Sequence, residues 1–157
     1  MTNPDVFMRN SKVPHLRVNT ANDGLVRSDG SFVLYWMTSA RRTSYNFGLQ
    51  RAVEWSRVLG LPLVVLEALR VGYKYASDRF HAFVLQGMAS NQQSLSGRGV
   101  VYHPYVERAP GEGKGLVMSL ANHAAVVITD DYPSFSLPKM IASAARQISV
   151  RFELVDS

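Results

Sequence analysis

Two aspartates, Asp130 and Asp131, follow directly after the apolar run 124–129. An apolar run of this length predicts a buried β-strand, so both carboxylates are expected at the strand's carboxyl end. There they can bind a ribose-like hydroxyl or a metal ion, or pair with a cation such as Arg41 or Arg42. The alternative for Asp131 is structural, because Asp-Tyr-Pro-Ser is a typical turn sequence that this residue can cap.

A second polar set follows the β-prone run Phe-Val-Leu-Tyr-Trp-Met at 32–37. Arg41 and Arg42 carry forks of donors that suit anionic oxygens. Trp36, near the end of the run, is either a core residue or a stacking wall for a flat ligand. Together with the two aspartates, these residues could hold a planar anionic molecule.

The sequence patterns around these residues predict strands and helices that alternate along the chain. Strands are expected at 32–37, 61–66, 100–102, 124–129 and about 150–154. The first helix begins at Thr43 or Ser44 and ends at Gly60, and the last runs from Pro138 to about Arg146. A short helix is expected at 116–121. Another begins at Ser77-Asp78, ends at Gly97, and carries on one side Phe80, Phe83, Val84, Gly87, Met88 and Leu95.

This alternation predicts an α/β fold with a Rossmann-like, five-stranded parallel sheet and helices on both faces. For the common strand order 3-2-1-4-5, the ligand crevice lies between the first and fourth strands, where the order reverses. Residues 36–42 and 129–133 would line it. Because charged and apolar residues alternate over 150–154, the fifth strand is expected to be half exposed at a sheet edge.

Composition limits the class of protein. The 157 residues suit one domain, with residues 1–30 as an N-terminal arm and 31–157 as the α/β domain. Cysteine is absent, which excludes disulfides, thiolate zinc sites and a cysteine nucleophile. The sequence shows no membrane-length apolar run and no signal-peptide pattern, so we expect a cytoplasmic protein without a membrane partner. The net charge of +5 is scattered, which favours solvated surface over a nucleic-acid face formed by this chain alone.

Two further patterns are weak. The loop Gly-Glu-Gly-Lys-Gly at 111–115 lacks the spacing of a phosphate-binding loop and is expected to be flexible. The four histidines show no ligand spacing, and His81 is expected to pack, so no metal site is predicted.

Several ordered motifs resemble the amino-terminal domain of class II DNA photolyases. They are Phe-Val-Leu-Tyr-Trp-Met at 32–37 with Arg41-Arg42, Asn-Phe-Gly-Leu at 46–49, Leu-Gly-Leu-Pro-Leu-Val-Val at 59–65, Arg-Phe-His-Ala-Phe-Val-Leu-Gln-Gly-Met at 79–88 and Val-Val-Ile-Thr-Asp-Asp-Tyr at 126–132. Elements at 16–19 and 28–31 fit the same pattern. The resemblance covers about 13–156, which is most of the chain.

The resemblance implies an antenna-type domain of a protein that splits cyclobutane pyrimidine dimers in DNA with light and FAD. FAD would be held by a carboxy-terminal helical domain that is absent from this chain, so no catalytic residue is expected here and the chain alone is expected to be inactive. The implied partners are that helical domain and damaged DNA, with self-association through the exposed inter-domain patch.

A deazaflavin-type antenna pigment would lie in the crevice. The residues assigned to it are Trp36, Met37, Arg41, Arg42, Asn46, Thr129, Asp130 and Asp131. Tyr45, Arg41 and Asp131 depart from the family's residues at their positions, and an empty site is the alternative. Two other functions stay open: a cryptochrome-like light-signalling domain and a stand-alone nucleotide-binding module.

Overall fold

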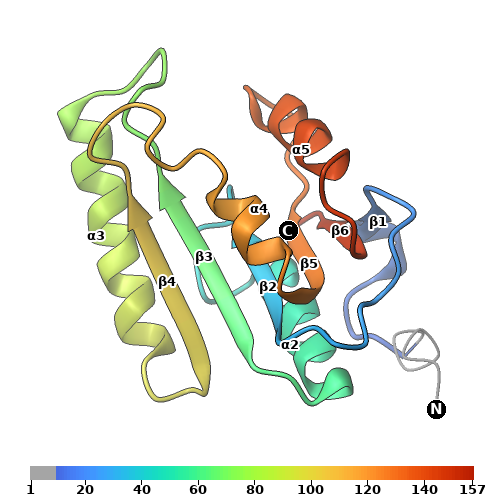
Figure 1. Ribbon diagram of the computed structural model, residues 1–157. Helices are drawn as coiled ribbons and strands as arrows, with labels where there is room; N and C mark the ends of the chain where they lie inside the picture. The colour runs from blue at the N-terminus through green and yellow to red at the C-terminus, as the bar shows by residue number, and fades with distance from the viewer. Residues whose placement is uncertain (1–9) are drawn as a thin grey trace.

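A computed structural model describes residues 10–157, so the first nine residues of the predicted arm lie outside the described part. The fold is mixed α/β, as predicted, and is built on one six-stranded sheet (Figure 1). The strands are β1 Val18–Thr20, β2 Phe32–Met37, β3 Leu63–Leu69, β4 Val100–Val106, β5 Ala124–Asp130 and β6 Phe152–Val155.

The sheet has six strands rather than the predicted five, in the order β1-β6-β5-β2-β3-β4. Within the set β2 to β6, every pair of neighbouring strands is parallel. Along the chain these strands alternate with helices, as expected. The difference from the prediction is β1, which comes from the segment interpreted as an arm and pairs antiparallel with β6. Three residues without alternation give no strand signal of their own, and only pairing with β6 makes them a strand.

Helices cover both faces of the sheet. On one face lie α2 Phe47–Leu59 and α3 Asp78–Leu95, and on the other lie α4 Leu116–Ala121 and α5 Leu137–Ala145. A short 3-10 turn, η1 His15–Arg17, precedes β1. Gly60 ends α2 in the left-handed conformation, as predicted. The predicted cap at Thr43 or Ser44 is wrong, because Asn46 caps α2 by accepting the Leu49 amide.

The predicted apolar stripe of α3 is only partly buried. Met88 and Leu95 pack inward, whereas Phe80 and Phe83 are exposed to solvent. Helical periodicity shows that these residues share one broad side, but it does not show which part of that side meets the sheet. Both phenylalanines therefore belong to the surface.

The last strand is buried, which corrects the prediction of a half-exposed edge. Glu153 is fully buried and receives hydrogen bonds from Arg51 Nε and Nη2, Trp55 Nε1 and Arg151 Nε, at 2.7 to 3.0 Å. Burial opposes ionisation of this carboxyl, but the hydrogen bonds and charge of Arg51 outweigh it and hold the Glu153 pKa below its ordinary value. Glu153 is thus part of the core, and its charge does not indicate that β6 is exposed to solvent.

Two glycines allow a direct test of backbone packing. A Cβ at Gly30 would lie 2.4 Å from Ala125 Cα, whereas a Cβ at Gly87 in α3 would meet nothing within 4 Å. We expect Gly30→Ala to lower the free energy of unfolding by about 1–3 kcal/mol through overpacking. Gly87→Ala should raise it by up to about 1 kcal/mol, because alanine favours the helix. Urea unfolding of both variants measures this, and equal effects would contradict it.

Among residues 10–157, no helix is both long enough and apolar enough to span a membrane.

Candidate functional site

The carboxyl ends of β2 and β5 lie side by side, as the predicted crevice requires. Asp130 ends β5 and is fully buried there. Its Oδ2 accepts the backbone N–H groups of Thr38, Ser39 and Ala40 at 2.8, 2.8 and 3.0 Å. Three successive N–H groups around one oxygen form an anion-binding nest. The chain's own carboxylate therefore occupies the position where a bound anion would lie.

Asn46 and Tyr35 complete the packing beneath this nest. The Tyr35 hydroxyl donates to Asp130 Oδ1 at 2.6 Å, and Asn46 Nδ2 donates to that hydroxyl and to the carbonyls of Ala40 and Arg42. Burial, followed by the charge of Asp130, raises the pKa of Tyr35 well above its ordinary value, so the hydroxyl stays a donor. Asn46 thus positions the loop and is itself buried.

Arg41 belongs to a second polar cluster, at the carboxyl end of β3. Its guanidinium donates to the Ala68 carbonyl at 2.6 Å and pairs with Glu67 at 3.3 Å. The buried Glu67 carboxylate also accepts from Asn91 Nδ2 at 2.9 Å and from the Tyr102 hydroxyl at 2.7 Å. Burial, then the hydrogen bond to Glu67, raises the pKa of Tyr102. Sequence reasoning missed this cluster, whose members come from β3, α3, β4 and the loop between β2 and α2.

Three other residues assigned to the crevice lie in the core. Met37 is fully buried, with its sulfur facing Asn91 Nδ2 at 3.8 Å. Trp36 is 7% exposed and packs in the core on the α4–α5 side of the sheet. Thr129 is buried, and its hydroxyl donates to the Trp36 carbonyl at 2.7 Å.

Arg42 and Asp131 are the two assigned residues that border open space at the crevice itself. They line a hollow of about 80 Å³ together with Ser39, Ala40, Tyr132 and Ser157. The alternative for Asp131 was a structural role as the cap of the turn that leads into α5. In the structure, the Asp131 amide donates to the Val155 carbonyl, and the N-cap residue of α5 is Ser136. Small-molecule sites usually measure roughly 300–1,000 Å³. The hollow at the crevice is therefore smaller than a usual small-molecule site.

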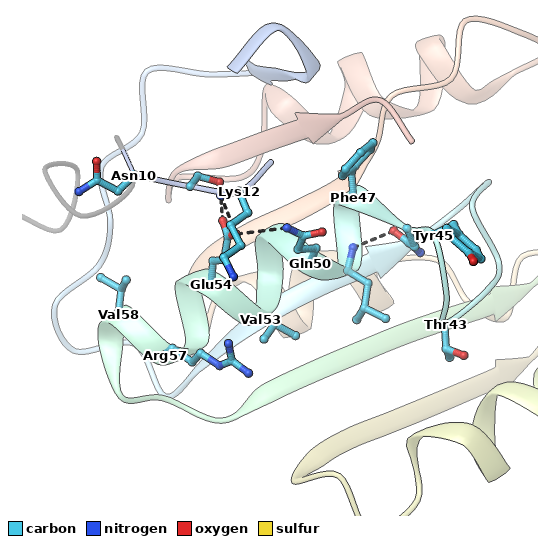
Figure 2. Close-up of a pocket in the computed structure, with 13 residues that line it drawn as sticks. Asn10, Lys12, Thr43, Tyr45, Phe47, Gln50, Val53, Glu54, Arg57 and Val58 are labelled. Atoms are coloured by element: carbon cyan, nitrogen blue, oxygen red, sulfur yellow. Dashed lines mark hydrogen bonds between the residues drawn. The ribbon is translucent and has the colours of Figure 1, made fainter. Parts of the chain in front are cut away.

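A larger hollow of about 930 Å³ lies along the outer side of α2 (Figure 2). Phe47, Val53 and Val58 supply apolar surface, while Lys12 and Arg57 bring positive charge. The Glu54 carboxylate holds the segment at 10–13 against the helix by accepting from the Ser11 hydroxyl and the Lys12 amide. Sequence reasoning missed this groove, because α2 carries apolar residues on both its core side and its outer side.

The glycine-rich loop at 111–115 connects β4 to α4. Gly113 N–H donates to the buried Glu107 carboxylate, which also accepts the Val71 amide, so a carboxylate of the chain again occupies backbone donors. Within residues 10–157, no three histidine or carboxylate side chains stand close enough together to hold a metal ion.

The fold defines a mixed α/β domain built on a mostly parallel, six-stranded sheet. No protein-family model matches the sequence. The chain is similar to the deoxyribodipyrimidine photo-lyase of Methanothermobacter thermautotrophicus, with 31% identity over 101 residues. The match covers 64% of this chain and 22% of that protein, so it is partial and distant. It supports a photolyase-like domain.

Proposed function

We propose that this chain is the α/β domain of a class II photolyase-like protein that repairs cyclobutane pyrimidine dimers with light and FAD. The observation that carries the proposal is the 31% identity over 101 residues to a deoxyribodipyrimidine photo-lyase. The mostly parallel sheet is compatible with it. In this proposal a helical domain outside this chain holds FAD and the damaged DNA, and the present domain packs against it.

The proposed domain contributes no acid, base or nucleophile to repair. Its polar clusters are internally satisfied: Asp130 binds backbone amides, and Glu67 binds Arg41, Asn91 and Tyr102. Such clusters fix the loops at the carboxyl edge of the sheet. A stand-alone nucleotide-binding module is less well supported, because the nest that could receive a phosphate is filled by Asp130.

Repair is tested on the whole protein in which this domain occurs, with residues 1–157 alone as the matched control. We expect the whole protein to carry FAD and to convert thymine dimers in an oligonucleotide back to thymines under blue light. The isolated chain should be colourless in the flavin band and inactive. A whole protein that carries FAD without repairing dimers would favour the cryptochrome-like alternative, and one without FAD would contradict the proposal.

The antenna role needs a separate test. The isolated chain is titrated with a deazaflavin, and the fluorescence of the deazaflavin is recorded. Because the crevice offers about 80 Å³, we expect no saturable binding there. The comparison variants are Arg42→Ala at the crevice and Phe47→Ser at the groove along α2. Binding that Arg42→Ala weakens and Phe47→Ser leaves unchanged would contradict the expectation and place the pigment in the crevice.

A further inference from the structure

The exposed aromatic residues gather at one edge of the sheet, namely the one formed by the carboxyl ends of the parallel strands. Among residues 10–157, all seven exposed phenylalanine and tyrosine side chains follow the carboxyl ends of β2, β3 and β5 or lie in the first two turns of α3. They are Tyr45, Tyr73, Tyr75, Phe80, Phe83, Tyr132 and Phe135. Because β3, β2 and β5 are consecutive in the sheet, their loops lie at the same edge, with the start of α3 beside them (Figure 1). We call this surface the aromatic edge.

Two of these rings belong to residues with unusual backbone conformations. Tyr45 has φ 52° and is 93% exposed, and Phe135 has φ 60° and is 84% exposed. A positive φ is strained for a bulky residue, and such strain concentrates at functional sites. The loop of Tyr45 is fixed, since Arg42 donates twice to the Tyr45 carbonyl. Both rings are therefore exposed to water on residues whose backbone is strained.

Exposed cations come from the same segments of the chain as the rings. The exposed cations of these loops, of the first turns of α3 and α5, and of the adjoining β4–α4 loop are Arg42, Arg70, Lys74, Arg79, Arg108, Lys114 and Lys139. Lys74 lies over the Tyr75 ring at 5.2 Å. The carboxylates of the same region that are not buried are Asp78, Glu112 and Asp131, and Glu112 is paired with Arg108. Exposed cations thus outnumber exposed carboxylates on the aromatic edge.

We propose that the aromatic edge binds single-stranded nucleic acid. Aromatic faces with interspersed cations suit this partner, because unpaired bases stack on rings while phosphates meet Lys and Arg. A duplex is a poorer fit, since its bases are already stacked. The opposite edge of the sheet lacks exposed phenylalanine and tyrosine residues within the described chain, so charge complementarity and stacking coincide at one edge. This binding is independent of light-driven repair and of FAD.

The test is fluorescence anisotropy of the isolated chain with a labelled oligothymidylate and with a duplex of the same length. We expect saturable binding to the single strand that weakens as salt rises from about 50 to 200 mM. Phe83→Ala with Phe135→Ala should weaken it roughly ten-fold or more, because the bases no longer stack on these rings. Lys74→Gln with Arg79→Gln should reduce the salt slope by about 0.7 for each phosphate that the protein no longer neutralises.

Controls come from the opposite edge. Leu25→Ala removes an exposed apolar side chain there, and Arg98→Gln with Arg146→Gln removes the same charge as the cation variant. All variants should retain the wild-type circular dichroism spectrum and melting temperature, since they alter exposed residues. The proposal is overturned by the absence of saturable binding at low salt, or by control variants that weaken binding as much as the edge variants. Aromatic-edge variants that abolish self-association while no oligonucleotide binds would overturn it too, and would assign the surface to a protein partner.

Discussion

Replacing Glu153 by alanine is expected to lower the free energy of unfolding by about 3–5 kcal/mol, the usual cost of removing one partner from a buried ion pair. The side chain of Arg51 is 6% exposed and would be left without its carboxylate, as would the Trp55 indole N–H. Urea unfolding at neutral pH measures the loss. As the matched control, Asp156→Ala removes an exposed pair with Arg17 and should cost about 0–1 kcal/mol.

The same carboxylate gives the stability a pH dependence of known sign. The pKa of Glu153 is lower in the folded protein than its ordinary value of 4.5. Its contribution is therefore fully present above pH 4.5 and is lost as the pH falls through the folded pKa. The difference in the free energy of unfolding between wild type and Glu153→Gln should therefore narrow as the pH falls below 4.5. A difference that stays constant down to acid unfolding would contradict the ion pair.

Asp130→Ala is expected to cost about 3 kcal/mol or more, because three backbone N–H groups would lose a charged acceptor inside the protein. The adjacent variant Asp131→Ala should change stability far less, since Asp131 borders solvent. Thermal unfolding of the two variants provides the comparison. Equal melting temperatures would mean that the nest does not hold the loop.

The emptied nest should itself bind an anion. In Asp130→Ala, the amides of Thr38, Ser39 and Ala40 would face the vacated space of one carboxylate, which formate matches in shape and charge. We expect formate to raise the melting temperature of this variant more than that of the wild type, with chloride at equal ionic strength as the control. Equal shifts in both proteins would show that the loop collapses once Asp130 is removed.

The sequence predicted β2, β3 and β5 because each is a short apolar run, and burial on both faces leaves such a run without alternation. The same reasoning failed for β6. Its alternating charges indicate solvent when considered alone, but Arg51 and Trp55, which surround Glu153, lie far away in the sequence. Only tertiary pairing makes a charged residue suitable for the core.

The candidate site shows a similar division. Topology placed Asp130 beside the loop that follows β2, and this neighbourhood is present in the structure. The sequence could not predict which groups the Asp130 carboxylate binds. Its partners are backbone N–H groups, which nearly every residue type provides. Arg41 was likewise expected to face a ligand, whereas Glu67 and the Ala68 carbonyl engage it. Periodicity identifies neighbours in space, but hydrogen-bond satisfaction decides which of them stay available.

The pairing of β1 with β6 joins the two ends of the described chain, since Val18 lies opposite Val155 and nearly all other residues lie between them. A contact across such a span closes a very long loop and is expected to form late in folding. During synthesis, β1 leaves the ribosome long before β6, so until then its backbone groups can bond only to water. The parallel core from β2 to β5 can assemble in that interval. The final pairing then makes the three-residue strand β1 the edge of the sheet, and so short an edge strand limits edge-to-edge aggregation.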